Sequence, residues 1–117
     1  MPEFCDVALP VPLETVFTYR VGPVEPVRGA RVLVPFRNLR LAGVVTALHD
    51  RAPKVTAKTI LDVLDGEPAL DDGLMRLGEW ISQYYLAPLG EVFRSMLPLA
   101  AEVRRARAYR IDRKSVV

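Results

Sequence analysis

The first part of the chain alternates hydrophobic and polar positions with the two-residue period of β-strands. Val32, Val34 and Phe36 share one face of one such segment, and the residues between them share the other. That segment and the next are expected to form a hairpin that turns near Arg37. Gly43 lies inside the longest segment, where a glycine often marks a bulge or a close backbone approach. The expected strands are Cys5–Leu9, Val16–Val21, Arg31–Phe36, Leu39–Leu48 and Lys58–Leu64.

Later in the chain the hydrophobic period changes to about 3.6 residues, which is typical of helices. The stretch 66–68 breaks the chain, and Asp71 or Asp72 is suited to cap the helix that follows. Pro88 fits the first turn of a second helix, and Pro98 is expected to end it. The expected apolar faces are Leu74, Leu77, Ile81 and Tyr84, with Trp80 beside them, in the first helix and Leu89, Val92, Phe93, Met96 and Leu97 in the second.

About five short strands followed by two short helices predict an α+β fold. We expect the antiparallel strands to curl into a small barrel-like sheet, with the helices capping it or lying beside it. A chain of 117 residues, half of them hydrophobic, is long enough for one domain with a single core. We therefore expect a domain over residues 1–100 and a basic linker or tail over residues 101–117, where arginines are dense.

The formal net charge of +2 is unevenly distributed. Residues 1–58 carry eight basic and five acidic side chains, residues 59–100 carry two and seven, and residues 101–117 carry six and two. A broad grip on duplex DNA needs many phosphate contacts, which the net −2 of residues 1–100 does not favour. A small, local nucleic-acid site in the first half is compatible with these charges, and ordinary solvated surface charge is the alternative.

Motifs of common enzymes are absent from the sequence, so no catalytic residue is expected in this chain. It contains no Walker A loop, nucleophile elbow or H-E-x-x-H helix. A single histidine and a single cysteine cannot build a conventional zinc site, so no metal is expected either. We expect His49 to be a structural or surface residue and Cys5 a small buried strand residue. The lone cysteine fits a reducing cytoplasm, and the apolar runs are too short to make a membrane an expected partner.

Two clusters of aromatic residues are candidates for stacking on nucleic-acid bases. In residues 80–85, helical spacing and an acidic neighbourhood favour a place in the core instead. Phe17 and Tyr19 flank Thr18 and share one face of an expected strand, with basic residues on that strand and its neighbours. Aromatic rings beside basic groups suit the end of a single strand, although a core position is the alternative here too.

Five blocks of sequence, in this order and at this spacing, resemble the N-terminal domain of the PriA family, the bacterial replication-restart helicases (primosomal protein N′). The blocks are Val7–Val21, Gly29–Phe36, Ala42–Val45, Ile60–Pro68 and Tyr84–Pro98, and together they cover roughly Cys5–Leu99. The resemblance implies a DNA-binding module that does no chemistry itself. It would recognise the 3′-hydroxyl end of the leading strand at a stalled replication fork, during primosome assembly and replication restart.

The same resemblance implies which residues form the DNA-binding pocket. In the family, backbone around an F-D-Y-like or F-T-Y-like triplet cradles the terminal nucleotide, and here the triplet is Phe17, Thr18 and Tyr19. Arg37 matches a lining position after the V-P-F motif, and Lys58 matches a lysine that completes the pocket. Some members have an acid in place of Thr18, so base contacts should differ here. Some members have glycine at the position of Arg37, and glycine lets a ligand approach the backbone closely. The arginine of this chain either blocks that approach or adds a phosphate contact.

The implied partners are single-stranded or forked DNA with a free 3′ end, the rest of a helicase and other primosome proteins, in the cytoplasm at the nucleoid. ATP and zinc would belong to the helicase core and the cysteine-rich region of the family, so no cofactor and no enzyme activity are expected in this chain. The alternative function is a protein-interaction module that docks onto the helicase core or another primosome component. The two differ in whether residues 17–19 and Lys58 converge on one open pocket or pack into the core.

Overall fold

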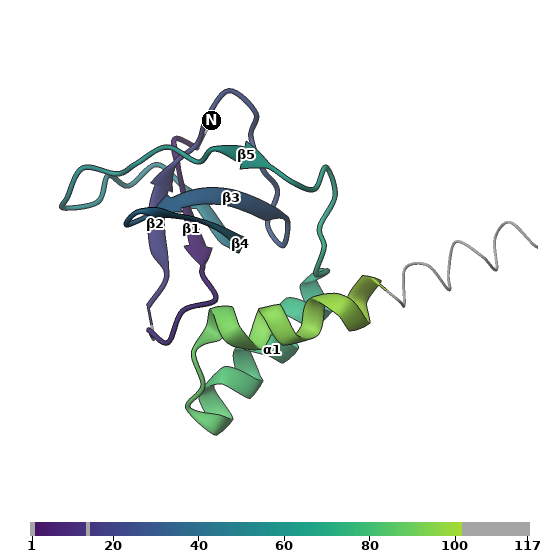
Figure 1. Ribbon diagram of the computed structural model, residues 1–117. Coiled ribbons are helices and arrows are strands. Elements are labelled where there is room, and N and C mark those ends of the chain that lie inside the picture. The colour runs from purple at the N-terminus through teal and green to yellow at the C-terminus, as the bar shows by residue number, and fades with distance from the viewer. Residues whose placement is uncertain (1, 14, 102–117) are drawn as a thin grey trace, which may run out of the picture.

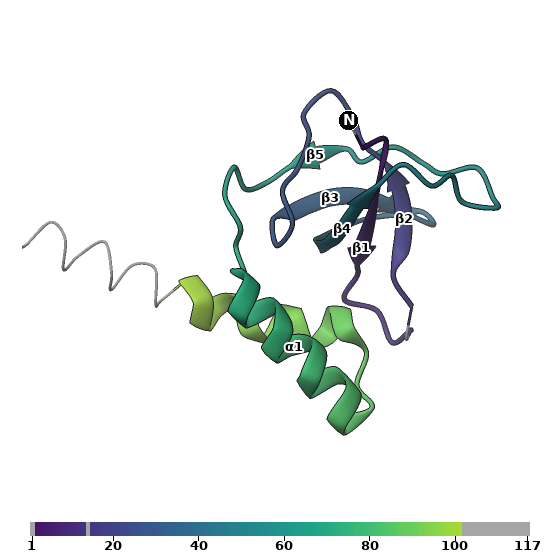
Figure 2. The ribbon, with the colours of Figure 1, turned by 180° about the vertical axis from the view of Figure 1, so that it is seen from behind.

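The structure is a computed structural model that describes residues 2–13 and 15–101, so the expected tail lies almost wholly outside the described residues. One antiparallel sheet has the strand order β2-β1-β4-β3-β5. Its strands are β1 (Phe4–Ala8), β2 (Phe17–Arg20), β3 (Arg31–Phe36), β4 (Leu39–His49) and β5 (Asp62–Val63). Helix α1 (Asp72–Tyr85) and a second helix over residues 89–101 lie together beneath one end of the sheet (Figures 1 and 2). The predicted α+β fold is confirmed, and the sheet is not closed.

Two hydrophobic clusters stabilise the sheet and its packing against the helices. Along each strand every second side chain points to the same face, so one face can be buried. Val32 and Val34 of β3 are fully buried, as their alternation predicts. They belong to a cluster inside the curved sheet that also contains Cys5, Val7, Leu9, Tyr19, Val45 and Ile60. A second cluster lies between the sheet and the helices and contains Ala8, Val44, Leu70, Met75, Phe93 and Ala100.

The expected strand Lys58–Leu64 is a regular strand only at β5. The N–H of Ile60 donates to the carbonyl oxygen of Arg20 in β2, at 3.0 Å, and the N–H of Leu61 donates to that of Leu33 in β3, at 2.7 Å. Residues 58–64, called the crossing segment below, therefore run from one edge of the sheet to the other. Because the segment changes partner within two residues, only its part at β5 keeps a regular register, in which Asp62 lies opposite Leu33 and Val63 opposite Val32.

Gly43 marks a close approach of two strands, as expected. A Cβ atom at this position would lie 2.5 Å from Cγ1 of Val7 and 2.8 Å from the carbonyl oxygen of Ala8. The pairing of β1 with β4 also shifts its register between Asp6 and Val7. The glycine thus gives β4 room to pass over β1 where the ladder is irregular.

The predicted core face of α1 is only partly correct, because Leu74 packs against the second cluster and Ile81 is half-buried, but the other members of the face are exposed. Leu77, Trp80 and Tyr84 are 47%, 56% and 66% exposed, whereas the buried residues of the helix are Met75 and Gly78. The start of the helix is as predicted, because the Asp71 carboxylate caps it by accepting a hydrogen bond from a backbone N–H in the first turn.

Gly78 explains why the predicted face was out of phase. A Cβ atom on Gly78 would collide with the ring of Phe93, so that ring packs directly on the backbone of α1. Glycine carries no hydrophobic signal, and the periodic pattern therefore pointed to the adjacent stripe. Trp80 and Tyr84 instead stack on each other at the surface, with ring centroids 5.0 Å apart.

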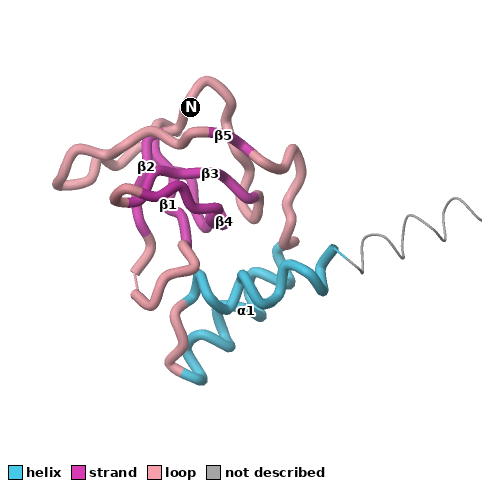
Figure 3. Tube along the Cα trace, in the orientation of Figure 1, coloured by secondary structure: helices cyan, strands magenta, loops and turns pink. Residues whose placement is uncertain are grey.

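The second helix continues past Pro98, so the prediction that it ends there is also wrong (Figure 3). Proline removes one backbone donor and disturbs the preceding turn, but Ala100 beyond it is buried in the cluster under the sheet. This burial favours continuing the helix. At the other end of the helix, Gly90 lies against the backbone of Leu9, so close that a Cβ atom would overlap the Leu9 carbonyl group.

Candidate nucleic-acid site

Strand β2 lies at an edge of the sheet and carries the aromatic triplet. Tyr19 is only 5% exposed, and its hydroxyl donates to the carbonyl oxygen of Pro35, at 2.9 Å. The ring of Phe17 meets that of Phe36 edge-on, with centroids 5.1 Å apart. The two rings therefore hold β2 against the end of β3 and form walls, and this packing favours the core alternative over free stacking on a base.

Burial extends the pH range over which this part of the site stays uncharged. Burial raises the pKa of Tyr19 above its ordinary value, with a smaller contribution from Cys5. Burial likewise raises the pKa of the Cys5 thiol to about 11, and the nearby carboxylate of Asp6 adds to the effect. Both groups would be protonated at neutral pH in any case, and burial keeps them so at more alkaline pH.

The outer edge of β2 presents unpaired peptide groups to its surroundings. The N–H of Arg20 donates to the carbonyl oxygen of Lys58, at 2.8 Å, and the Arg20 carbonyl accepts from Ile60, so the peptide groups of Arg20 point away from β1. Peptide groups along a strand alternate in direction. Those of Thr18, two residues earlier, consequently point to the same side, before the crossing segment begins. Among residues 2–13 and 15–101, nothing pairs with the one donor and the one acceptor of the Thr18 backbone on this side.

A cavity of about 450 Å³ lies beside this open edge. All five residues predicted for the DNA-binding pocket, Phe17, Thr18, Tyr19, Arg37 and Lys58, line it. The other lining residues are Thr15, Val16, Pro35, Phe36, Pro53, Val55, Thr56 and Ala57. Three separate parts of the chain thus meet here: β2, the β3–β4 turn and the loop that leads into the crossing segment. That the five residues bind DNA stays a prediction.

Arg37 occupies the first position of the β3–β4 turn. Its φ of 55° lies in the left-handed region, which costs a non-glycine residue about 1 kcal/mol. Its guanidinium lies 5.3 Å from the centre of the Phe36 ring, on which it packs. The cavity is present with this arginine at its rim, so the side chain does not fill it.

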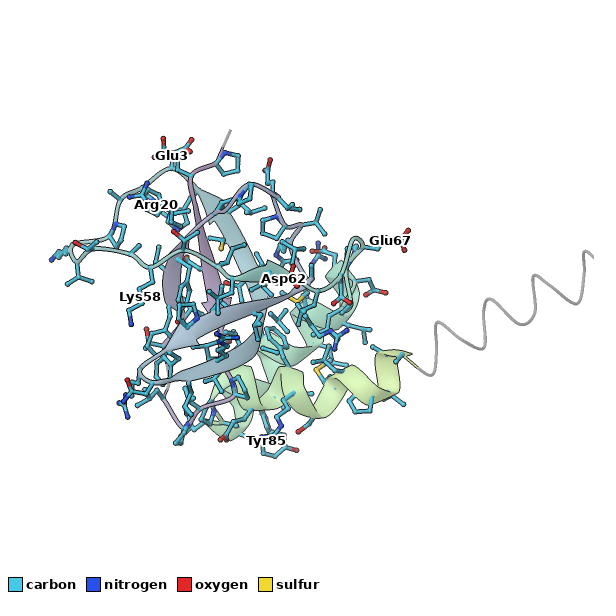
Figure 4. The ribbon with its side chains drawn as sticks, turned by 45° about the horizontal axis from the view of Figure 1, so that its top comes forward. Glu3, Arg20, Lys58, Asp62, Glu67 and Tyr85 are labelled. Atoms are coloured by element: carbon cyan, nitrogen blue, oxygen red, sulfur yellow. The ribbon has the colours of Figure 1, made fainter. Side chains whose placement is uncertain are left out.

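Lys58 stands at the start of the crossing segment with its side chain exposed. Figure 4 shows Lys58 on the same side of the sheet as Arg20, away from Tyr85 at the far end of α1. Within the described part of the chain, the lysine ammonium makes no ion pair. Among the lining residues that the structure describes, Lys58 and Arg37 are the charged ones, and no acid is among them. The cavity therefore favours an anionic ligand.

Sequence reasoning missed the wall formed by Pro53 and Val55. Both belong to a segment that looked like an ordinary polar loop, yet they line the cavity opposite β2. Val55 is 76% exposed, as isolated aliphatic side chains on protein surfaces often are. The sequence therefore offered no clear signal for this wall.

The remaining candidate groups have structural roles. His49 hydrogen-bonds to Asp6 and packs on the ring of Phe4, and Cys5 is fully buried in β1, as predicted for both. Among residues 2–13 and 15–101, no three His, Cys, Asp or Glu side chains come together as metal ligands would. In the same residues, no helix is long and apolar enough to span a bilayer.

Comparison with known proteins identifies the family. The family model described as the 3′DNA-binding domain (3′BD) of PriA matches residues 6–98. This chain belongs to that family. Similar relatives are the replication restart proteins PriA of Haemophilus influenzae, 35% identical over 96 residues, and of Buchnera aphidicola from Schizaphis graminum, 30% identical over 95 residues. The PriA of Bacillus subtilis is 32% identical over 85 residues.

The matches cover 80%, 79% and 71% of this chain, respectively. They cover only 13%, 13% and 11% of the three relatives. The resemblance to the PriA domain seen in the sequence is therefore confirmed. The chain spans only a small part of the length of these replication restart proteins.

Proposed function

We propose that this chain binds the 3′-hydroxyl end of a DNA strand in the cavity beside β2. The observation that carries the proposal is the combination of an open peptide edge with a single cavity whose described lining contains two basic side chains and no acid. A volume of about 450 Å³ lies within the range of about 300–1,000 Å³ typical of small-ligand sites. It suits one nucleotide and not a duplex.

The recognition would depend on main-chain atoms, so it would not depend on the sequence of the strand. The peptide N–H and carbonyl of Thr18 offer one donor and one acceptor to the base or the sugar. Lys58 and Arg37 at the rim would contact the phosphate that precedes the terminal nucleotide, Lys58 as a point charge and Arg37 with its planar fork. A cavity with room for one nucleotide admits a strand that ends there and excludes one that continues.

In this proposal the domain belongs to a PriA-like protein that acts at stalled replication forks. It would orient the larger protein on the leading strand, and the ATP-dependent helicase activity and the zinc-binding region would belong to other segments. The chain matches only a small part of the length of each relative, which supports placing those activities in other segments. Other primosome proteins would be partners of the whole assembly.

A second candidate is favoured by the exposed aromatic face of α1. Trp80 and Tyr84 form a stacked pair at the surface, and exposed tryptophan and tyrosine are enriched at protein interfaces. This face would attach the domain to the helicase core or to another primosome protein. It does not compete with the cavity, because the residues that line the cavity come from the sheet and its loops.

The test is fluorescence anisotropy of the whole chain with two short single-stranded oligonucleotides, identical except for a 3′-hydroxyl or a 3′-phosphate. Any contribution of the basic residues after Ala101 is common to both oligonucleotides, so the ratio of the two dissociation constants reports the end alone. We expect about tenfold tighter binding of the hydroxyl form. Equal binding would reduce the domain to a basic surface, and no binding to either would favour the protein-interaction function.

A further inference from the structure

A chain of hydrogen bonds runs behind Thr18 on the face of the sheet opposite to the Phe17 and Tyr19 rings. The hydroxyl of Thr18 donates to Oδ1 of Asp6, at 2.8 Å, and Nε2 of His49 lies 2.9 Å from the same oxygen. The backbone N–H of Arg51 donates to Nδ1 of His49, at 3.1 Å. Because Nδ1 accepts, the proton of the neutral ring is on Nε2, which donates to Asp6. Each donor in this series of three hydrogen bonds is thus assigned to one acceptor.

The position of these hydrogen bonds in the sheet indicates their structural role. Asp6 and Thr18 stand directly opposite each other in the pairing of β1 with β2. Since the peptide groups of Thr18 point outward, this is a pair without backbone hydrogen bonds, in which side chains lie closest. Strand β2 has only four residues and lies at the edge of the sheet. At this point the Thr18 hydroxyl supplies the hydrogen bond that ties β2 to β1.

We propose that Asp6 is a positioning residue of the nucleotide site, an inference that rests on the proposed function. Through Thr18, Asp6 holds the open peptide groups of β2 at the place where the terminal nucleotide binds. His49 holds Asp6 in turn. Asp6 touches no ligand itself, because it is not among the residues that line the cavity. The side chains of Asp6 and His49 are only 21% and 14% exposed, so water competes weakly for these bonds.

A purely structural role for Asp6 makes a different prediction, and Thr46 provides the matched control. The hydroxyl of Thr46, in β4, donates to the backbone carbonyl of Asp6, at 3.2 Å. Thr46→Val therefore removes a hydroxyl that contacts the same residue from the other neighbouring strand, without touching Thr18. If Asp6 matters only for stability, Thr46→Val and Thr18→Val should act alike.

The experiment measures the preference for a 3′-hydroxyl over a 3′-phosphate oligonucleotide by anisotropy, with the whole chain. We expect Asp6→Ala and Thr18→Val each to lower the preference about fivefold, and the double variant to lower it no further, because both remove the same contact. Thr18→Ser keeps the hydroxyl and should keep the preference. Thr46→Val should keep it as well. Urea unfolding of each variant confirms that the compared proteins are folded.

The outcomes separate this proposal from the proposed function. If the unmodified chain prefers the hydroxyl and Asp6→Ala and Thr18→Val keep that preference, the role of Asp6 is overturned and end recognition stands. Additive losses in the double variant, or an equal loss in Thr46→Val, would also overturn it. An unmodified chain without preference overturns both. Should Asp6→Ala fail to fold, the contrast of Thr18→Val with Thr18→Ser decides.

Discussion

The molecule contains two aromatic clusters that look alike in the sequence but differ in the fold, because one faces inward and the other faces the solvent. Around the cavity, Phe17 and Tyr19 turn inward, and both contact the end of β3. On α1, Trp80 and Tyr84 stack on each other and face the solvent. The first cluster builds the walls of a site from buried rings, and the second forms a surface.

The surroundings of the two clusters differ in charge as well. The described residues that line the cavity carry only basic charges, whereas residues 59–100, which include α1, carry a net −5. An anionic strand is therefore attracted to the sheet and repelled by the helices. Aromatic content alone does not distinguish the two regions; the charge around the rings and the open edge of β2 do, and both support the function proposed for the cavity.

The largest expected effect comes from separating the two regions at the point where they touch. Gly90→Ala places a Cβ atom into the backbone of Leu9, so the second helix must shift away from the sheet. We expect the free energy of unfolding in urea to fall by about 3 kcal/mol.

Gly66→Ala is the matched control, because nothing lies within 4 Å of the added atom. It should change stability by less than about 0.5 kcal/mol. Equal stability of the two variants would show that the helices do not depend on this contact.

Alkaline pH should weaken the sheet region specifically. The pKa of Cys5 is raised from 9.0 to about 11 in the folded chain, so above pH 9 the unfolded chain loses its proton first. The folded state then binds more protons than the unfolded state, and stability falls as pH rises from about 9 to about 11, by about 2 kcal/mol in all. The raised pKa of Tyr19 acts in the same direction.

Urea unfolding at a series of pH values measures this slope. Cys5→Ala removes one of the two groups, so its stability should fall less steeply over the same interval, whatever its stability at pH 7. An identical slope in the variant would show that Cys5 does not contribute.

A smaller effect is expected on DNA binding when the basic rim is changed. Lys58→Ala removes an exposed cation that lines the cavity and should weaken binding of a 3′-hydroxyl oligonucleotide about tenfold. Arg76→Ala removes an exposed cation that is already paired with Asp72 on α1, and should leave anisotropy unchanged. Equal losses would indicate general electrostatic attraction and remove the contrast between the two regions.

The smallest effect is expected at the exposed aromatic pair. Trp80→Ala removes a ring that contacts Tyr84 but leaves both hydrophobic clusters intact. We expect a loss of less than about 1.5 kcal/mol in the free energy of unfolding and an unchanged preference for the 3′-hydroxyl. A loss of that preference in this variant would place the nucleic-acid site on α1 instead of β2.

Much of the fold followed from local patterns. Alternation placed β1 to β4 within about one residue at most ends, since each strand buries one face. The helix cap, expected at Asp71 or Asp72 and found at Asp71, and the apolar position of Phe93 in the second helix also followed from neighbours along the chain. The resemblance to the PriA domain named five residues of the site, and the structure brings them around one cavity.

What escaped prediction depends on contacts between distant segments. Gly78 receives Phe93, and a glycine gives no hint of the ring that will cover it. The crossing segment has the composition of a strand but is shared between two edges. The wall at Val55 exists only because the loop before that segment folds over β2. Secondary-structure preferences of single residues do not predict these contacts between distant segments.

The crossing segment also couples ligand binding to the mechanics of the sheet. It is the strap that joins the β2 edge to the β3 edge, and the cavity lies between β2 and the start of that strap. Under the proposed function, a strand end bound in the cavity would contact both β2 and the start of the crossing segment. Because such a ligand would bind only the folded domain, it would stabilise the attachment of the crossing segment to β2 by mass action, and a loaded domain should resist pulling forces that would peel β2 from an empty one.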